Sequence, residues 1–267
     1  MGQELMYDKN SFIIALLLFM ALLLVNQIAF ALGKRNHSVD NPEMKTQSTA
    51  IQTGIIGLLA LLLGFTFNMS LQRYDARSNA VIEESGAINR VAMHVSLLGS
   101  PNKAEIFEEL DQYLALRIKL SQVDQSDTKT RQAINKDVSA SQLRLLAFAE
   151  KELDNPTKTS AANSFYQALT QLILVENKRT SMLRLHVPEP VLFLLFIVFL
   201  TAGGMLGYTS GLGNKRPAFP TVVMFTLIVF VVFIIIDLDR PKRGVIKVNQ
   251  ESLIDTSLQL QEYKLSI

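Results

Sequence analysis

The chain has 267 residues, and 26 basic against 24 acidic side chains leave a formal net charge of +2. Such a balanced charge argues against a nucleic-acid partner, because nucleic-acid-binding domains carry a clear excess of positive charge. The sequence contains no cysteine, which excludes disulfides, thiolate metal sites and a cysteine nucleophile. Its hydrophobic residues gather in four runs that are almost free of charge, and this pattern is typical of integral membrane proteins.

The first apolar run extends from about residue 11 to residue 32 and is interrupted only by Asn26 and Gln27. Its length suffices to cross the hydrocarbon core of a bilayer. The alternative is a cleaved signal peptide, since Ala29 and Ala31 resemble a cleavage site. However, the run is too long and its leader contains acidic residues. We therefore expect a membrane span that is retained.

Three further apolar runs predict membrane spans, and they cover about residues 49–71, 191–210 and 219–236. Only a short turn separates the last two spans, so these form a membrane hairpin. The third span contains three glycines at four-residue spacing, which permit close approach of helix backbones. We expect Gly203, Gly207 and Gly211 to pack against the second or the fourth span.

Residues 72–188 form one hydrophilic insert that is predicted to be helical throughout, without strands. Apolar residues recur at seven-residue spacing at Val81, Ile88 and Val95, with Val91 and Leu98 on the same face. The next helix is expected to start with Ser100 as N-cap and Pro101 at its first position, and to reach about Val123. Asp127 is expected to cap a third helix that ends near Asn155 and Pro156, and a fourth carries its apolar face at Phe165, Leu169, Leu172 and Ile173.

The predicted fold is therefore an all-α membrane protein with four transmembrane helices and a helical insert between the second and third spans. We divide the chain into residues 1–71 (the first two spans), 72–188 (the insert), 189–240 (the hairpin) and 241–267 (a C-terminal tail).

Lysine and arginine near the span ends predict the orientation. With four spans, both termini and the insert share one side of the membrane. That side carries the larger set, which is Lys9, Arg73, Arg77, Arg179, Arg184, Arg240, Lys242 and Arg243. The opposite side carries Lys34, Arg35, Lys45, Lys215 and Arg216. We expect the protein to lie in the inner (plasma) membrane of the cell. Its termini and the insert are then expected to lie in the cytoplasm.

The second span continues into the insert without a helix breaker. At 100 degrees per residue one stripe of this helix contains Gly54, Gly57, Leu61, Phe65, Asn68, Gln72, Asp75, Asn79, Glu83, Gly86 and Arg90. Copies of this helix around an axis would form an apolar constriction followed by a polar vestibule. The alternative is that the small residues are packing contacts and that the polar stripe is a solvated face. The candidate pore-lining residues are Gly57, Leu61, Phe65, Asn68, Gln72, Asn79 and Glu83.

The fourth span ends in two carboxylates, Asp237 and Asp239, followed by Arg240. Carboxylates at a membrane boundary are costly unless they are paired. We expect a structural ion pair with Arg240 or Arg73. A cation site is the alternative, but two aspartates lack the further oxygen ligands that calcium requires.

The sequence gives little support for catalysis. His37, His94 and His186 are scattered and lack a second ligand at metal spacing. Glu83 and Glu84 are adjacent, so on a helix they point about 100 degrees apart and cannot easily share a substrate. We expect neither an enzyme nor a bound cofactor or metal.

Two segments of the chain resemble the bestrophin-like domain family of mainly bacterial membrane proteins: LLALLLGFTFNMSLQRYDARSNAVIEESGAI and IDLDRPKRGVIKVNQESLID. The likeness extends from about Gly54 to the C-terminus. It implies a four-span helical protein distantly related to bestrophins, which are pentameric anion channels with a hydrophobic neck on the second span. The resemblance places this neck at Leu61 and Phe65, with Leu58 or Asn68 as neighbours.

Two functions are consistent with these features. The first is a homo-oligomeric channel for inorganic anions in the lipid bilayer, lined by the second span and pentameric if the resemblance extends so far. The second is a non-conducting membrane scaffold or sensor whose helical insert binds a cytoplasmic partner, for which the face of Val81, Ile88 and Val95 is a candidate.

Overall fold

The computed structural model describes residues 10–36, 42–124, 127–154, 159–183, 185–214, 216–240 and 245–265. These residues form eight α-helices and no strand, which confirms the all-helical fold class. The helices are α1 (Ser11–Arg35), α2 (Pro42–Leu97), α3 (Lys103–Gln122), α4 (Thr128–Leu153), α5 (Thr159–Met182), α6 (Glu189–Leu212), α7 (Ala218–Asp239) and α8 (Glu251–Leu265). The predictions that concern Lys9, His37, Asn155, Pro156, Arg184, Lys215, Lys242 and Arg243 lie outside the described residues.

Four of the eight helices, α1, α2, α6 and α7, are long and apolar enough to cross a membrane. Each of them contains one of the four predicted spans. The second of them is a single helix of 56 residues, as the absence of a helix breaker predicted. The chain divides into two compact units, of which unit 1 contains residues 1–73 and 186–240 and unit 2 contains residues 74–185 and 241–267. Helix α2 contributes to both units.

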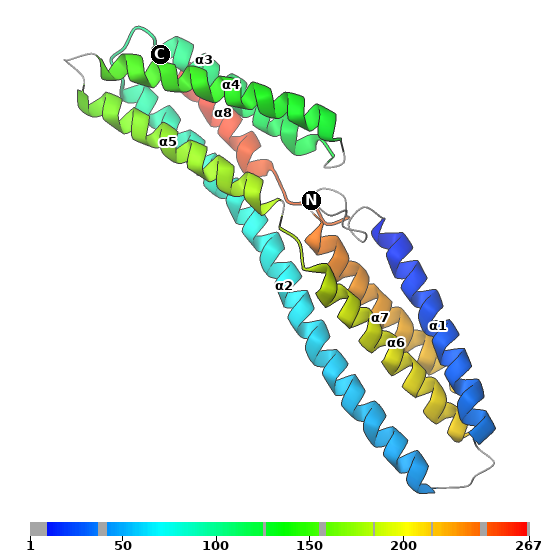
Figure 1. Cartoon of the computed structure of the whole chain (residues 1–267). Coiled ribbons are helices and arrows are strands. Elements are labelled where there is room, and N and C mark those ends of the chain that lie inside the picture. The colour runs from blue at the N-terminus through cyan, green and yellow to red at the C-terminus, as the bar shows by residue number, and fades with distance from the viewer. Residues whose placement is uncertain are drawn as a thin grey trace. The chain divides into compact units, whose positions relative to one another are not determined.

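In unit 1, helix α1 packs closely along α6 and also against α7 (Figure 1). The glycines of α6 permit this approach, because a Cβ at Gly207 or Gly211 would overlap the main-chain carbonyl of Asn26 or Phe30 in α1. Asn26 also donates a hydrogen bond from Nδ2 to the carbonyl oxygen of Gly203 at 2.9 Å.

The three glycines of α6 were predicted to pack against the second or the fourth span. This prediction was wrong for Gly207 and Gly211, which pack against α1. At Gly203 it was correct in part, since a Cβ there would contact Phe225 of α7 as well as Leu22 of α1. Spacing shows that a helix face allows close approach, but it does not identify which of three apolar neighbours takes that place.

Unit 2 has its own hydrophobic core, to which α2 contributes Val81, Ile88, Val91 and Val95. The predicted apolar face of this helix is thus present, and the structure shows it buried. Helices α3, α4, α5 and α8 supply further core residues, among them Phe107, Leu145, Leu169 and Leu260. No helix was predicted within residues 241–267, whereas α8 lies there and packs against α3.

Two predicted helix starts have different outcomes. Asp127 caps α4, since its side chain accepts a hydrogen bond from the backbone N–H of Thr130 at 3.1 Å. Helix α3 begins at Lys103, two residues later than predicted. Ser100 instead accepts from the backbone N–H of Asn102 at 3.1 Å and donates to Glu152 of α4 at 2.5 Å, so this serine ties a turn to a neighbouring helix.

Candidate functional site

The candidate site is the stripe of α2 that the sequence analysis singled out as pore-lining. All seven candidates are uncovered by the rest of the chain, namely Gly57, Leu61, Phe65, Asn68, Gln72, Asn79 and Glu83. Leu61 and Phe65 keep 56% and 61% of their surface exposed, so a single copy leaves both apolar side chains without a buried environment. On other faces of the same stretch, Leu59, Thr66 and Ser70 are buried.

The glycines of α2 differ from those of α6 in their surroundings. A Cβ built at Gly54, Gly57, Gly64 or Gly86 would have nothing within 4 Å beyond its chain neighbours and the adjoining backbone of its own helix. Packing within one chain therefore does not account for these four small residues, whereas it does account for those of α6. The alternative explanation of the α2 glycines, as contacts between helices, would require a surface supplied by another molecule.

Below the apolar part of the stripe the exposed side chains are polar and partly bonded to each other. Gln72 donates from Nε2 to Asn68 Oδ1 at 3.1 Å, one helical turn away. Glu83 forms an ion pair with Lys178 of α5, whose Nζ lies 2.7 Å from Glu83 Oε2. The carboxylate of this candidate is thus matched by a cation within its own unit.

A buried charge network holds another face of α2 in unit 2. Glu84 accepts hydrogen bonds from Arg117 of α3, at 2.5 Å from Nε and 3.2 Å from Nη2, and from Arg179 of α5. Arg117 also donates from Nη1 to Glu176 at 2.9 Å. Burial acts to raise the pKa of Glu84, but the two guanidinium groups outweigh it and hold that pKa below its usual value. Glu84 is therefore an anion at neutral pH.

From the sequence, Glu83 and Glu84 were considered only as a candidate catalytic pair, and the role of Glu84 was missed. One signal was present in the sequence. Glu84 lies between Val81 and Ile88, three and four residues away, on the face that was predicted to be apolar. A carboxylate in such a position requires cationic partners from neighbouring helices.

The predicted boundary residues lie together at the end of α7. Arg73 Nε is 3.9 Å from Asp239 Oδ1, while Asp239 Oδ2 accepts the backbone N–H of Val187 at 2.8 Å. His186, which the sequence analysis set aside, has Nδ1 3.9 Å from Asp239 Oδ2. Asp237 and Arg240 are also buried.

The structure thus brings Arg73 next to Asp239. That these residues form a structural ion pair that holds the fourth span stays a prediction. No group of three or more His, Cys, Asp or Glu side chains in the described ranges is arranged to hold a metal ion. His94 lies in the last turn of α2, where it is partly exposed.

Comparison with known proteins identifies the family. The family model described as Bestrophin-like domain matches residues 16–253, nearly the whole length, and the chain therefore belongs to the Bestrophin-like domain family. This finding confirms the resemblance inferred from the two sequence segments. The family is not an enzyme family, and together with the four long apolar helices it fits a membrane protein. No curated protein and no solved structure matches the chain.

Proposed function

We propose that this member of the Bestrophin-like domain family assembles into a homo-oligomeric anion channel, with copies of α2 around the conduction axis. The observation that carries the proposal is the exposed stripe of α2, in which two large apolar side chains are followed by polar ones along one continuous helix. A single chain leaves this stripe uncovered, as a pore-lining surface requires.

Leu61 and Phe65 would form the constriction of such a pore. They are four residues apart, so rings of each would stack about 6 Å apart along the axis. A narrow apolar ring resists entry of water and ions, and it gates a pore by dewetting. Asn68, Gln72, Asn79 and Glu83 follow as a polar vestibule. The pairing of Glu83 with Lys178 reduces the negative charge presented there, which favours passage of anions.

The proposal is tested by planar-bilayer recording from the purified protein. We expect a current whose reversal potential in a KCl gradient indicates chloride permeability. Leu61→Ala and Phe65→Ala should each increase the conductance or the open probability, because they widen the apolar constriction. The matched control is Leu227→Ala in α7, at a leucine with 61% of its surface exposed, close to the value for Leu61.

The two leucine variants separate a pore from a general effect of the membrane surface. An unchanged current in Leu61→Ala and Phe65→Ala would remove α2 from the pore. Equal effects of Leu61→Ala and Leu227→Ala would attribute the change to altered lipid contact. Absence of any current from folded, oligomeric protein, under all salt, calcium and voltage conditions, would exclude the channel.

The alternative function is a membrane scaffold or sensor. The prediction that Val81, Ile88 and Val95 form its docking face is wrong, because these side chains are buried in the core of unit 2. A charged residue at Ile88 would therefore unfold unit 2 rather than test a partner. A scaffold would have to use exposed residues such as Leu143 and Leu174, and a partner that is lost on Leu143→Glu would support it.

The proposed location is the inner membrane of a bacterial cell, with the termini and unit 2 in the cytoplasm. It rests on the excess of lysine and arginine near the span ends on that side.

A further inference from the structure

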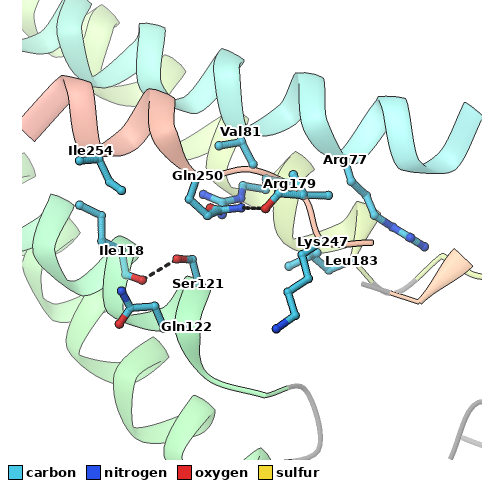
Figure 2. A pocket seen from close by; sticks show the side chains of 11 residues that line it. Arg77, Val81, Ile118, Ser121, Gln122, Arg179, Leu183, Lys247, Gln250 and Ile254 are labelled. Carbon is cyan, nitrogen blue, oxygen red and sulfur yellow. Dashed lines mark hydrogen bonds between the residues drawn. The ribbon is translucent and has the colours of Figure 1, made fainter. Parts of the chain in front are cut away.

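We propose that unit 2 contains a binding pocket for a small organic anion with an apolar body, apart from the proposed pore. The pocket has a volume of about 380 Å³, within the range of small-molecule sites. It is lined by α2, α3, α5, the segment before α8, and α8 itself (Figure 2). All residues that line the pocket belong to unit 2.

The charge of the lining selects an anion. Three lining residues are cationic, namely Arg77, Arg179 and Lys247, and none of the residues that the structure assigns to this lining is acidic. Arg179 is held in place by hydrogen bonds to Glu84 and Gln250. It donates from Nη2 to Gln250 Oε1 at 2.8 Å. The network of Glu84, Glu176, Arg117 and Arg179 has equal numbers of positive and negative charges, so the further positive charge of the lining comes from Lys247. Arg77 donates from Nη2 to the carbonyl oxygen of Leu185 at 2.7 Å.

The remaining lining residues select the body of the ligand. Val81, Ile118, Leu183, Val248 and Ile254 supply an apolar wall. Figure 2 shows Arg179 and Gln250 at the middle of the pocket, with Ile118, Ser121 and Gln122 on one side and Arg77 on the other. A ligand with one charged group and one apolar group matches this lining, and a bare inorganic ion would leave the apolar wall unused.

Binding is measured by isothermal titration of the full chain in nanodiscs, with protein-free nanodiscs as the blank. The probes are phenyl phosphate, inorganic phosphate, benzyl alcohol and benzylammonium. We expect phenyl phosphate to bind at least tenfold more tightly than inorganic phosphate, and the neutral and cationic probes not to bind. This order separates the anionic contribution from the apolar one.

Two variants assign the binding to the pocket. Lys247→Gln should weaken phenyl phosphate binding about tenfold, which corresponds to about 1.4 kcal/mol. Lys136→Gln, which removes the same charge from an exposed position of α4 outside the pocket, should bind as the unchanged chain does. Ile254→Ser should weaken phenyl phosphate but leave inorganic phosphate unaffected. Melting temperatures of the three variants confirm that each one folds.

Three results would overturn the proposal. One is no binding of phenyl phosphate at millimolar concentration. Another is the same loss in Lys247→Gln and Lys136→Gln, which would indicate a general charge effect. The third is equal affinity for phenyl phosphate and inorganic phosphate, which would remove the apolar part of the site. None of these results depends on whether the protein conducts ions.

Discussion

Glu83 and Glu84 show how position on a helix decides what a carboxylate contributes. Glu83 meets Lys178 at the surface, where solvent screens the pair, and such pairs contribute about 0–1 kcal/mol. Glu84 is fully buried and accepts hydrogen bonds from two arginines. Removal of one member of a buried ion pair leaves its partner charged without compensation, at a cost of about 3–5 kcal/mol.

We therefore expect Glu84→Gln to lower the thermal stability of the solubilised protein by several kcal/mol and Glu83→Gln to change it little. Thermal unfolding in detergent, followed by circular dichroism, measures both. Since the pKa of Glu84 is lowered on folding, its stabilising contribution is complete above the usual value of 4.5 and is lost as pH falls through the folded-state pKa. Glu84→Gln should flatten this acid dependence. Equal melting temperatures for the two variants would contradict the expectation.

The boundary cluster allows a second prediction at the scale of single residues. Arg73 and Asp239 lie within ion-pair distance, at 3.9 Å, and the carboxylate of Asp239 is almost fully buried. Arg73→Gln and Asp239→Asn should each lower the melting temperature, and the double variant should cost less than their sum. Coupling of Arg73 to Asp237 should be weaker in a parallel cycle. Additive effects in the first cycle would show that the contact has no energetic weight.

At the scale of helices, glycine has two different uses in this chain. In α6 it lets α1 approach until main-chain atoms touch, and any side chain at Gly207 or Gly211 meets a carbonyl that cannot move aside. In α2 the space beside Gly57 is open in a single copy. The same residue type thus marks a contact inside the chain in one helix and lies on an open surface of the single chain in the other.

Gly207→Ala should destabilise the bundle of α1 and α6 by about 1–3 kcal/mol, the usual cost of overpacking. Gly57→Ala should fold normally as a single chain, because nothing lies near the added methyl group. Yield and melting temperature in detergent measure both effects. A variant Gly207→Ala that melts like the unchanged protein would show that α1 and α6 can separate without loss.

Long-range contacts mark the limit of prediction from this sequence. The length and face of α2 were predictable, because an unbroken run without proline and a regular apolar spacing are local features. The partner of the α6 glycines and the position of Glu84 among Arg117 and Arg179 depend on residues more than 30 positions away. Helix α8 is short and only weakly apolar, so its place in the core of unit 2 follows from packing rather than from its own pattern.

At the scale of the whole molecule, α2 contributes residues both to the proposed pore and to the proposed anion pocket. Arg77 and Val81 line the pocket of unit 2, and Asn79, between them in the sequence, belongs to the exposed stripe of the same helix. An anion in the pocket would thus contact the same turns of helix that carry the proposed vestibule. If both proposals hold, phenyl phosphate should change the current, and Lys247→Gln should remove that change.

Orientation in the membrane can be tested because the chain contains no cysteine. A single cysteine is introduced at Lys136, exposed on α4, or at Gln47, exposed near the start of α2 before its apolar run. If unit 2 is cytoplasmic, an impermeant maleimide applied to intact cells should label Gln47→Cys and spare Lys136→Cys until the cells are permeabilised. The reverse pattern would place unit 2 outside, and any soluble ligand of its pocket would then come from outside the cytoplasm.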